Sequence, residues 1–442
     1  MRWRGPATAA LAIFVLATPL AGCTRPAADN LLFITFDTTR ADHLSAYGYR
    51  RMTSPAIDSL AKRGAHFMRA YSQVPSTLPA HSTMFTGLLP PEDGVRCNGK
   101  YRLSAARTTL AETLAAEGFD TGAILGAFPL DSRFGLDQGF AVYDDDFASS
   151  ALTAKRRKGR MDDPGFWIGH EFVDFERGAD EVTGRALNWL AERKRPWFLF
   201  VHYFDAHWPY EPPEAFAGAQ DSAYDAEIAS ADFELGRLLD AVERMPGRTL
   251  IVFTADHGEG LGEHGEQLHN RFLYDSTLHV PLVIVLDGKV AHGLKVEDPV
   301  GHVDLFSTVL ELLGVRAASP PSGRSLVPLL EGKSLPPRPV YAETLVPTLE
   351  RPQGIEVRAW IDGREKLIRT DTIGGEVRIE LYDLVADPQE ISDLSRVDPK
   401  RTRALLDALD AERARLEKSA VPPEALAVDE GTEQRLKSLG YL

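Results

Sequence analysis

Four apolar runs, at residues 31–36, 197–201, 249–254 and 280–286, constrain the fold of this chain more than any other feature. They are rich in β-branched and aromatic residues and lack polar alternation, which is typical of strands buried on both faces. Helical patterns lie between them, as at residues 179–193. Strands that alternate with helices predict an α/β fold, in which helices sandwich a mostly parallel sheet.

The chain changes character after about residue 335, where short strand patterns are separated by glycine-containing turn signals. These patterns lie at residues 340–344, 357–361, 366–369 and 378–381. They predict a small C-terminal α+β domain with an antiparallel sheet. The predicted organisation is a signal peptide (1–22), a tether (23–29), a catalytic α/β domain (30–318), a linker (319–334) and a C-terminal subdomain (335–442).

The N-terminus has the pattern of a targeting segment. Arg2 and Arg4 precede an apolar run at residues 9–20, which indicates a secretory signal. The segment ends in Leu-Ala-Gly-Cys and resembles the bacterial lipoprotein box, in which Cys23 becomes the lipidated first residue of the mature chain; the alternative is a plain secretory cleavage site. We therefore expect a lipid-anchored protein of the bacterial cell envelope. Thr24 is not a retention-type Asp, which favours the periplasmic side of the outer membrane.

The charge balance restricts the class of partner. The chain carries 64 acidic and 49 basic side chains, for a formal net charge of −15. An acidic chain without a basic tract argues against nucleic acid as a partner. We interpret the basic cluster at residues 155–160 as a solvated loop. Membrane contact is expected through the lipid anchor only, and the oligomeric state is left open.

Two of the apolar runs lead into residues that could bind a metal ion or act in catalysis. Asp37 follows the first run, and Asp256 and His257 follow the third. The carboxyl ends of parallel strands meet at one edge of a sheet, where open α/β folds place their functional residues. Two carboxylates and one imidazole there predict a site for a divalent metal. Taken singly, each residue has the alternative of a cap or a hydrogen-bonded surface group.

Thr77 lies two residues before Pro79, ahead of a run that can be helical. The N-terminus of a helix has unpaired N–H groups and favours an anionic ester. With the predicted metal nearby, Thr77 is expected to serve both as a metal ligand and as a nucleophile. The alternative is an ordinary capping hydroxyl.

Five segments resemble signatures of the sulfatase family, in the same order across nearly the whole mature chain. They are residues 30–49, 76–87, 198–213, 254–265 and 380–394. The chain is thereby similar to the sulfatase branch of the alkaline phosphatase superfamily. This resemblance implies an N-terminal α/β domain that carries a metal site, and a C-terminal domain with a four-stranded antiparallel sheet.

Compared position by position, the resemblance implies that Asp37 and Asp256 are metal ligands, while Thr38 replaces another family aspartate. His257 stands where many sulfatases have Asn. The Asp-His pair resembles relatives that use zinc or manganese, with calcium as the alternative. Thr77 stands where true sulfatases carry a Cys or Ser that is matured to formylglycine, and a Thr there resembles phosphodiesterases and lipid-headgroup phosphotransferases of the superfamily.

Three histidines, His202, His207 and His269, are the expected substitutes for anion contacts of the family, and His81 is a further candidate catalytic residue. His207 matches the family's substrate-contacting His and is assigned a catalytic role, and His269 falls near the place of a substrate-binding Lys. His202 is assigned to substrate binding. His81, one helical turn after Thr77, is expected to face the same anion; its alternative is an ordinary histidine on a helix surface.

These features together predict a metal-dependent hydrolase of sulfate or phosphate esters, with phosphodiester or phosphonate esters favoured over sulfate. The expected substrate is a small-molecule, glycan or lipid ester. Two alternatives stay open: a lipid-headgroup phosphotransferase, and a non-catalytic protein that binds sulfated or phosphorylated glycans.

Overall fold

The computed structural model describes residues 1, 3, 28–150, 176–194, 196–218, 220–345, 355–372 and 374–426. The predicted lipidation site Cys23 and the basic cluster at residues 155–160 lie outside these ranges. Within them, every helix is too short or too polar to cross a membrane.

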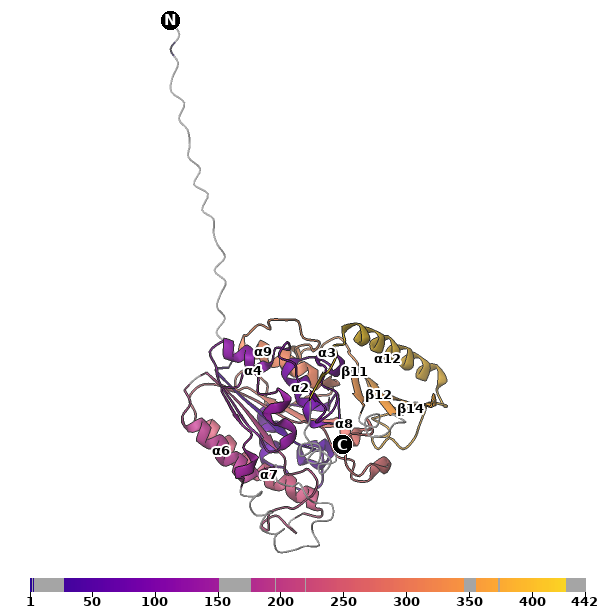
Figure 1. Cartoon of the computed structure of the whole chain (residues 1–442), viewed down its shortest axis with the longest axis horizontal. Helices are drawn as coiled ribbons and strands as arrows, with labels where there is room; N and C mark the ends of the chain where they lie inside the picture. Colours follow the sequence, from indigo (N-terminus) through magenta and orange to yellow (C-terminus); the bar gives the residue numbers. More distant parts are fainter. Residues whose placement is uncertain are drawn as a thin grey trace.

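A large mixed sheet forms the centre of the molecule (Figure 1). Its strands, in spatial order, are β10 (Val300–Gly301), β2 (Ala65–Tyr71), β8 (His279–Val285), β7 (Thr249–Ala255), β1 (Asn30–Phe36), β6 (Trp197–Tyr203), β4 (Asp120–Ile124) and β5 (Val142–Asp144), and β9 (Leu294–Val296) pairs with β2. The central strand β1 is parallel to both of its neighbours, β6 and β7. The predicted mostly parallel α/β fold is confirmed.

Both faces of this sheet are covered by helices, which explains the uninterrupted apolar runs. In β1, Leu31 and Phe33 pack toward one face and Leu32 and Ile34 toward the other, and all four are fully buried. The helices of the first face are α2 (Thr77–Thr86), α4 (Leu110–Ala116) and α9 (Leu305–Leu313), and those of the second are α1 (Pro55–Arg63), α6 (Ala179–Ala191) and α7 (Ala223–Glu243). Figure 1 shows α6 and α7 on the opposite side of the sheet from α4 and α9.

Two strands depart from the pattern expected from the sequence. The apolar run at 280–286 does form a strand, but β8 is antiparallel to both β7 and β2. β2 was not predicted, because His66 and Arg69 interrupt its apolar pattern. The sheet is therefore mixed on the side that leads to β10.

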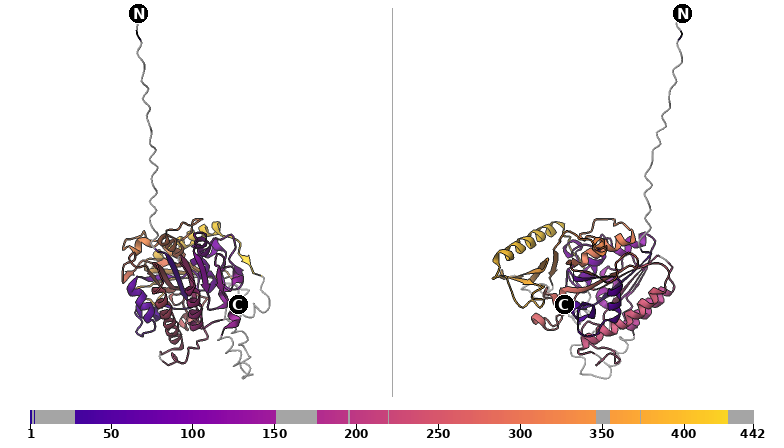
Figure 2. Two further views of the ribbon diagram at one scale, coloured as in Figure 1. Left: turned by 90° about the vertical axis from the view of Figure 1, so that its left-hand side faces the viewer. Right: turned by 180° about the vertical axis from the view of Figure 1, so that it is seen from behind.

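A four-stranded antiparallel sheet forms the C-terminal part, as the resemblance implied. Its strands are β11 (Val340–Thr344), β12 (Ile355–Asp362), β13 (Glu365–Thr372) and β14 (Val377–Asp383), and α12 (Pro399–Ser419) packs on it. Figure 2 shows this sheet and α12, in orange and yellow, beside the large sheet. The remaining short elements are α3 (Pro90–Asp93), α8 (Asp275–Leu278), α10 (Val327–Leu330), and the pair β3 (Tyr101–Arg102) and β15 (Glu424–Ala425).

Bonds across the boundary hold the two sheets together. The N–H of Glu343, on β11, donates to the carbonyl of Gln73 over 2.9 Å. The Glu343 carboxylate accepts two hydrogen bonds from Arg96, of 2.6 and 2.7 Å. Because Glu343 is only 1% exposed, this bidentate ion pair is a buried link between the two parts of the chain.

Candidate metal-dependent active site

Asp37 and Asp256 lie side by side because their strands are paired in register. The last residue of β1, Phe36, is opposite the last residue of β7, Ala255. The Asp256 N–H continues this pairing by donating to the Phe36 carbonyl over 3.3 Å. Both aspartates are at most 1% exposed, so the parallel strand ends bring two buried carboxylates to one point.

The backbone around Asp256 fixes which carboxylate oxygen faces the site. Asp256 Oδ1 accepts from the N–H of His257 over 2.8 Å and from the N–H of Thr38 over 3.2 Å. Thr38 has a positive φ of 50°, a strained conformation for a β-branched residue, which brings its N–H to this oxygen. Its hydroxyl donates to the Ala206 carbonyl over 2.7 Å, so this side chain is hydrogen-bonded outside the cluster.

His257 completes a three-residue cluster. Its Nδ1–H donates to the Gly258 carbonyl over 2.9 Å, which fixes the tautomer and leaves the Nε2 lone pair for another partner. This Nε2 lies 3.6 Å from Asp256 Oδ2 and 3.9 Å from Asp37 Oδ1. The ligand atoms of the three side chains all lie within 4.8 Å of one another.

The residues present fit a divalent cation. In the described part of the chain, the three atoms Asp37 Oδ1, Asp256 Oδ2 and His257 Nε2 are buried and have no hydrogen-bond partner. Burial raises the pKa of Asp37 to about 7, with a smaller contribution from Glu259. Burial and the neighbouring Asp37 raise the pKa of Asp256. A cation among these atoms would remove the repulsion and satisfy all three.

Thr77 is the first residue of α2, and its hydroxyl points into this cluster. The Thr77 hydroxyl donates to Asp37 Oδ2 over 3.4 Å. Next to it, the Leu78 N–H donates to the Asn98 side-chain oxygen over 2.7 Å. The structure thus joins all four residues predicted as metal ligands, namely Asp37, Thr77, Asp256 and His257, in one buried site.

His81 lies beneath the site rather than facing it. Its Nδ1–H donates to the Thr77 carbonyl over 2.7 Å, and its Nε2 accepts from the Thr35 hydroxyl over 2.9 Å. The ring is fully buried, and this burial lowers the pKa of His81 to about 3. The helix-surface position is wrong, because the helix face that carries His81 packs on β1, where its bonds hold the backbone of Thr77. Its Nδ1 also lies 3.9 Å from Asp256 Oδ2, and the contact with an anion stays a prediction.

His202 contacts a predicted metal ligand. From β6, its Nε2–H donates to Asp37 Oδ2 over 3.2 Å, and the ring is fully buried. Burial lowers the pKa of His202 to about 4, so the ring is neutral at pH 7. Its nearest polar contact is Asp37, which indicates a role in orienting that carboxylate. His202, His81 and Asp256 also form a second group whose ligand atoms lie within 4.8 Å.

His207 and His269 lie together on the open side of the cluster. The centre of the His269 ring is 4.4 Å from that of His257 and 5.2 Å from that of His207. His207 also lines a cavity of about 300 Å³. Burial lowers the pKa of both rings, to about 4 for His269. His207 therefore lines the cavity, and the His269 ring contacts both His207 and the ligand-cluster residue His257.

Two further site residues were missed by the sequence reasoning. Glu259 is fully buried and accepts from His269 Nδ1 over 3.2 Å and from the Tyr210 hydroxyl over 3.1 Å. Asn98 is 1% exposed, and its side-chain nitrogen has no partner among the described residues. Glu259 lies within the resembling segment 254–265, which offered a signal. No feature of the sequence pointed to Asn98, because only the fold brings its loop next to Thr77.

Comparison with known proteins agrees with this site. The family model described as Sulfatase matches residues 29–315, and the model for the C-terminal region of N-sulphoglucosamine sulphohydrolase matches residues 262–419. Metal-dependent ester hydrolysis is the class of chemistry that this fold and site define, and the chain belongs to the sulfatase family.

Relatives are similar over most of their length. An uncharacterized sulfatase of Escherichia coli K12, YidJ, is 25% identical over 86% of this chain and 87% of its own. An N-acetylglucosamine-6-O-sulfatase of Bacteroides thetaiotaomicron is 22% identical over 88% and 87%. The crystal structure of a phosphonate monoester hydrolase of Agrobacterium radiobacter has a TM-score of 0.71 and 24% identity, over 89% of this chain and 96% of that one. The predicted ester hydrolase is confirmed at this level.

Proposed function

We propose that this protein hydrolyses phosphodiesters or phosphonate esters in preference to sulfate esters, with Thr77 as the nucleophile. One observation carries the proposal: the Thr77 hydroxyl lies 3.4 Å from Asp37 Oδ2, beside a cluster of buried ligand atoms that fits a divalent cation. A hydroxyl at such a place is suited to covalent catalysis.

The identity of the nucleophile supports the preference for phosphorus esters. Thr77 stands at the position of the residue that sulfatases mature to formylglycine, and it lacks the Cys or Ser that this maturation needs. Phosphonate monoester hydrolases of Agrobacterium radiobacter and Silicibacter pomeroyi share the fold, with TM-scores of 0.71 and 0.66. Phosphonate ester hydrolysis, the activity by which these two proteins are named, is the one that we propose for this chain.

The side chains of the cluster have separate tasks. Asp37, Asp256 and His257 would hold the cation, which, when bound, acts as a Lewis acid and favours the ionised form of a nearby hydroxyl. Asp37 Oδ2 orients the Thr77 hydroxyl. His81, through its bond to the Thr77 carbonyl, keeps the first turn of α2 in place.

The reaction proceeds in two displacements at phosphorus. Thr77 Oγ1 gives its proton to Asp37 Oδ2, to which it donates, and forms a bond to phosphorus while the bond to the ester oxygen breaks; the departing oxygen takes up a proton. Water then attacks phosphorus, the bond to Thr77 Oγ1 breaks, and Oγ1 takes up the proton that the water loses. We assign proton donation to His207, which lines the neighbouring cavity, and to His269 beside it. The negative charge of a bound ester raises the pKa of these rings toward neutrality, so that a protonated ring can donate to the leaving oxygen.

The donor set favours zinc or manganese over calcium. Calcium prefers six to eight oxygen ligands, whereas this cluster has an imidazole nitrogen among few donors. Imidazole with carboxylates suits zinc and related transition metals.

A substrate panel tests this function. The purified protein is loaded with zinc, manganese or calcium and assayed on aryl phosphodiester, phosphonate ester, phosphate monoester and aryl sulfate. We expect phosphodiester or phosphonate turnover to exceed sulfate turnover, and zinc or manganese to give the highest rates. Aryl sulfate as the best substrate would overturn the proposal, and products joined to an added alcohol acceptor would favour the phosphotransferase.

We further propose that Cys23 anchors the protein to the cell envelope, on the basis of its lipoprotein-box pattern. Replacement of Cys23 by Ser should move the protein from the membrane fraction to the soluble periplasm. Membrane retention of the Cys23→Ser variant would contradict the anchor.

A further inference from the structure

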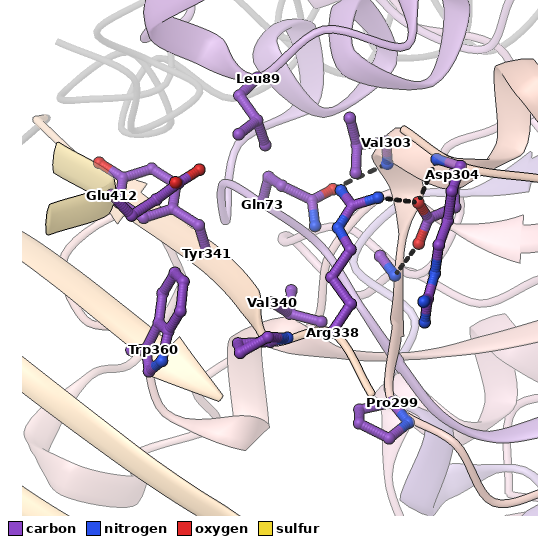
Figure 3. A pocket seen from close by; sticks show the side chains of 13 residues that line it. Gln73, Leu89, Pro299, Val303, Asp304, Arg338, Val340, Tyr341, Trp360 and Glu412 are labelled. Carbon is purple, nitrogen blue, oxygen red and sulfur yellow. Dashed lines mark hydrogen bonds and ion pairs between the residues drawn. The ribbon is translucent and has the colours of Figure 1, made fainter. Parts of the chain in front are cut away.

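A second cavity lies between the two sheets, away from the active site. It has a volume of about 120 Å³, well above the roughly 10–15 Å³ that one water molecule needs. Its lining comes from the segment after β2, from β10 and the turn after it, from the segment after α9, and from β11, β12 and α12. Figure 3 shows Gln73, Asp304 and Arg338 on one side and Tyr341 and Trp360 on the other.

Gln73 presents a fixed donor to this cavity. Its side-chain oxygen accepts from the Val303 N–H over 3.1 Å, so its amide nitrogen must point the other way. The residue is 1% exposed, and this nitrogen has no hydrogen-bond partner among the described residues. A Cβ on Gly301 would come within 2.2 Å of it. The glycine thus leaves room for a buried donor that lacks an acceptor.

Two arginines add positive charge at the same place. Arg338 donates to Asp304 Oδ1 over 3.1 Å, and the side chain of Arg324 also lines the cavity, with its Nε buried and unpaired in the described structure. Burial and the nearby Arg338 lower the pKa of Arg324, and this outweighs the effect of Asp304, which raises it. The Arg338 guanidinium is thus paired with Asp304, whereas the Arg324 guanidinium donates from Nη1 to the Pro336 carbonyl.

The acceptor capacity of that carboxylate is already used. Asp304 Oδ1 accepts from the Arg324 backbone N–H over 2.9 Å as well as from Arg338, and Oδ2 accepts from the Gly301 N–H over 3.2 Å. The indole nitrogen of Trp360 is a further buried donor without a partner in the described residues. The carboxylate of Glu412 also lines the cavity, and both of its oxygens accept from Arg415. The lining thus leaves buried N–H groups unpaired while its carboxylate oxygens are already engaged, a pattern that suits an anion.

We propose that this cavity binds a small tetrahedral oxyanion, inorganic sulfate or phosphate, through Gln73, Arg324 and Arg338. The volume has room for such an ion, and the unpaired N–H groups of Gln73, Arg324 and Trp360 suit its oxygen atoms. The ion joins the catalytic part, through Gln73 and Arg324, to the C-terminal sheet, through Arg338. Gln73 precedes Thr77 by four residues, so this site adjoins the segment that leads to the proposed nucleophile.

Isothermal titration calorimetry of the full-length protein tests the site, with sodium sulfate and sodium phosphate in separate titrations and chloride used to hold the ionic strength constant. Gln73→Glu keeps the acceptor for the Val303 N–H but replaces the donor with a carboxylate. Arg338→Gln removes one charge from a side chain that is 32% exposed and is therefore tolerant of change. Arg403→Gln, on α12 with 74% exposure, is the matched control for charge.

We expect Gln73→Glu and Arg338→Gln each to weaken oxyanion binding by about tenfold or more, the effect of one charge-assisted hydrogen bond. Arg403→Gln should stay within about twofold of the unmodified protein. Asp256→Asn should keep this binding event, because its change is confined to the active site. Far-ultraviolet circular dichroism checks that each variant is folded.

Two results would overturn the proposal. One is unchanged affinity in folded Gln73→Glu or Arg338→Gln, which would mean that the cavity holds water alone. The other is loss of all oxyanion binding in Asp256→Asn, which would assign the whole signal to the active site.

Discussion

The Thr77 hydroxyl donates to Asp37 Oδ2 across forty positions of sequence, over 3.4 Å. The same carboxylate oxygen accepts from His202 over 3.2 Å, and the other oxygen lies 3.9 Å from His257 Nε2. Asp37 is therefore the side chain through which the proposed nucleophile, the predicted metal ligands and the surrounding histidines contact one another. Its position at the end of the central strand β1 makes each of these contacts depend on the large sheet.

Thr77→Ala is expected to lower kcat by about 10³-fold or more, because it removes the group that forms the covalent bond. Thr77→Ser should retain measurable turnover, because it keeps the hydroxyl. Steady-state rates on the best phosphorus ester measure both effects. Thr83→Ala is the control, since Thr83 is a buried threonine on the same helix, and it should keep most of the activity. Full activity in Thr77→Ala would show that the nucleophile is another group.

Asp256→Asn should weaken metal binding by at least about 100-fold, because it removes a ligand oxygen. In the metal-free protein the same substitution is expected to raise the melting temperature, because burial and Asp37 raise the pKa of Asp256 and the substitution removes this repulsion. Metal analysis and thermal unfolding with and without a chelator measure the two effects. The matched control, Asp232→Asn, alters a buried aspartate outside the cluster and should leave metal content unchanged. Equal metal content in Asp256→Asn would remove Asp256 from the ligand set.

Arg96→Met should destabilise the protein by about 3–5 kcal/mol, since it leaves the buried Glu343 carboxylate without its charged partner. The double variant with Glu343→Leu is expected to recover much of that loss. Urea unfolding monitored by circular dichroism gives the values. An exposed ion pair provides the comparison. Arg403→Met removes the ion pair with Asp407 and should lower the free energy of unfolding by at most about 1 kcal/mol. Equal costs for the two substitutions would show that the link between the sheets contributes little.

The stabilising effect of Asp232 should decrease as the pH rises. Its carboxylate accepts from the N–H groups of Ala56 and Ile57 at the start of α1, and burial raises its pKa from 3.8 to about 7. The folded protein therefore holds a proton that the unfolded chain loses between these two values, so the contribution is complete below pH 4 and is lost as the pH rises to 7. The melting-temperature difference between the unmodified protein and Asp232→Asn should decline across this range. A difference that grows with pH would mean that Asp232 is ionised in the folded state.

The sequence was informative where regular strands place residues. Asp37 and Asp256 were found because each follows a run of buried residues, and parallel pairing brings such ends together by geometry alone. The C-terminal sheet was found because its turns carry glycine. β2 was missed because His66 and Arg69 break the apolar pattern, although neighbouring elements pack against its two ends.

The rest of the site depends on contacts that no local pattern encodes. The orientation of His81 is set by the hydroxyl of Thr35, a residue of the adjacent strand. Asn98 reaches the segment after Thr77 from an irregular loop, and Glu259 is placed by Tyr210 and His269. Such positions are fixed by tertiary packing, which sequence periodicity does not record.

The pairing of β1 with β6 and β7 determines how late in folding the catalytic centre can form. Asp37 is made more than two hundred residues before Asp256, and the strand that precedes it has no partner in the large sheet until β6 and then β7 have been translated. Contacts so distant in sequence close late in folding. A chain that ends before residue 257 therefore lacks the complete ligand cluster, and the full cluster can bind a metal only after β7 has joined the large sheet.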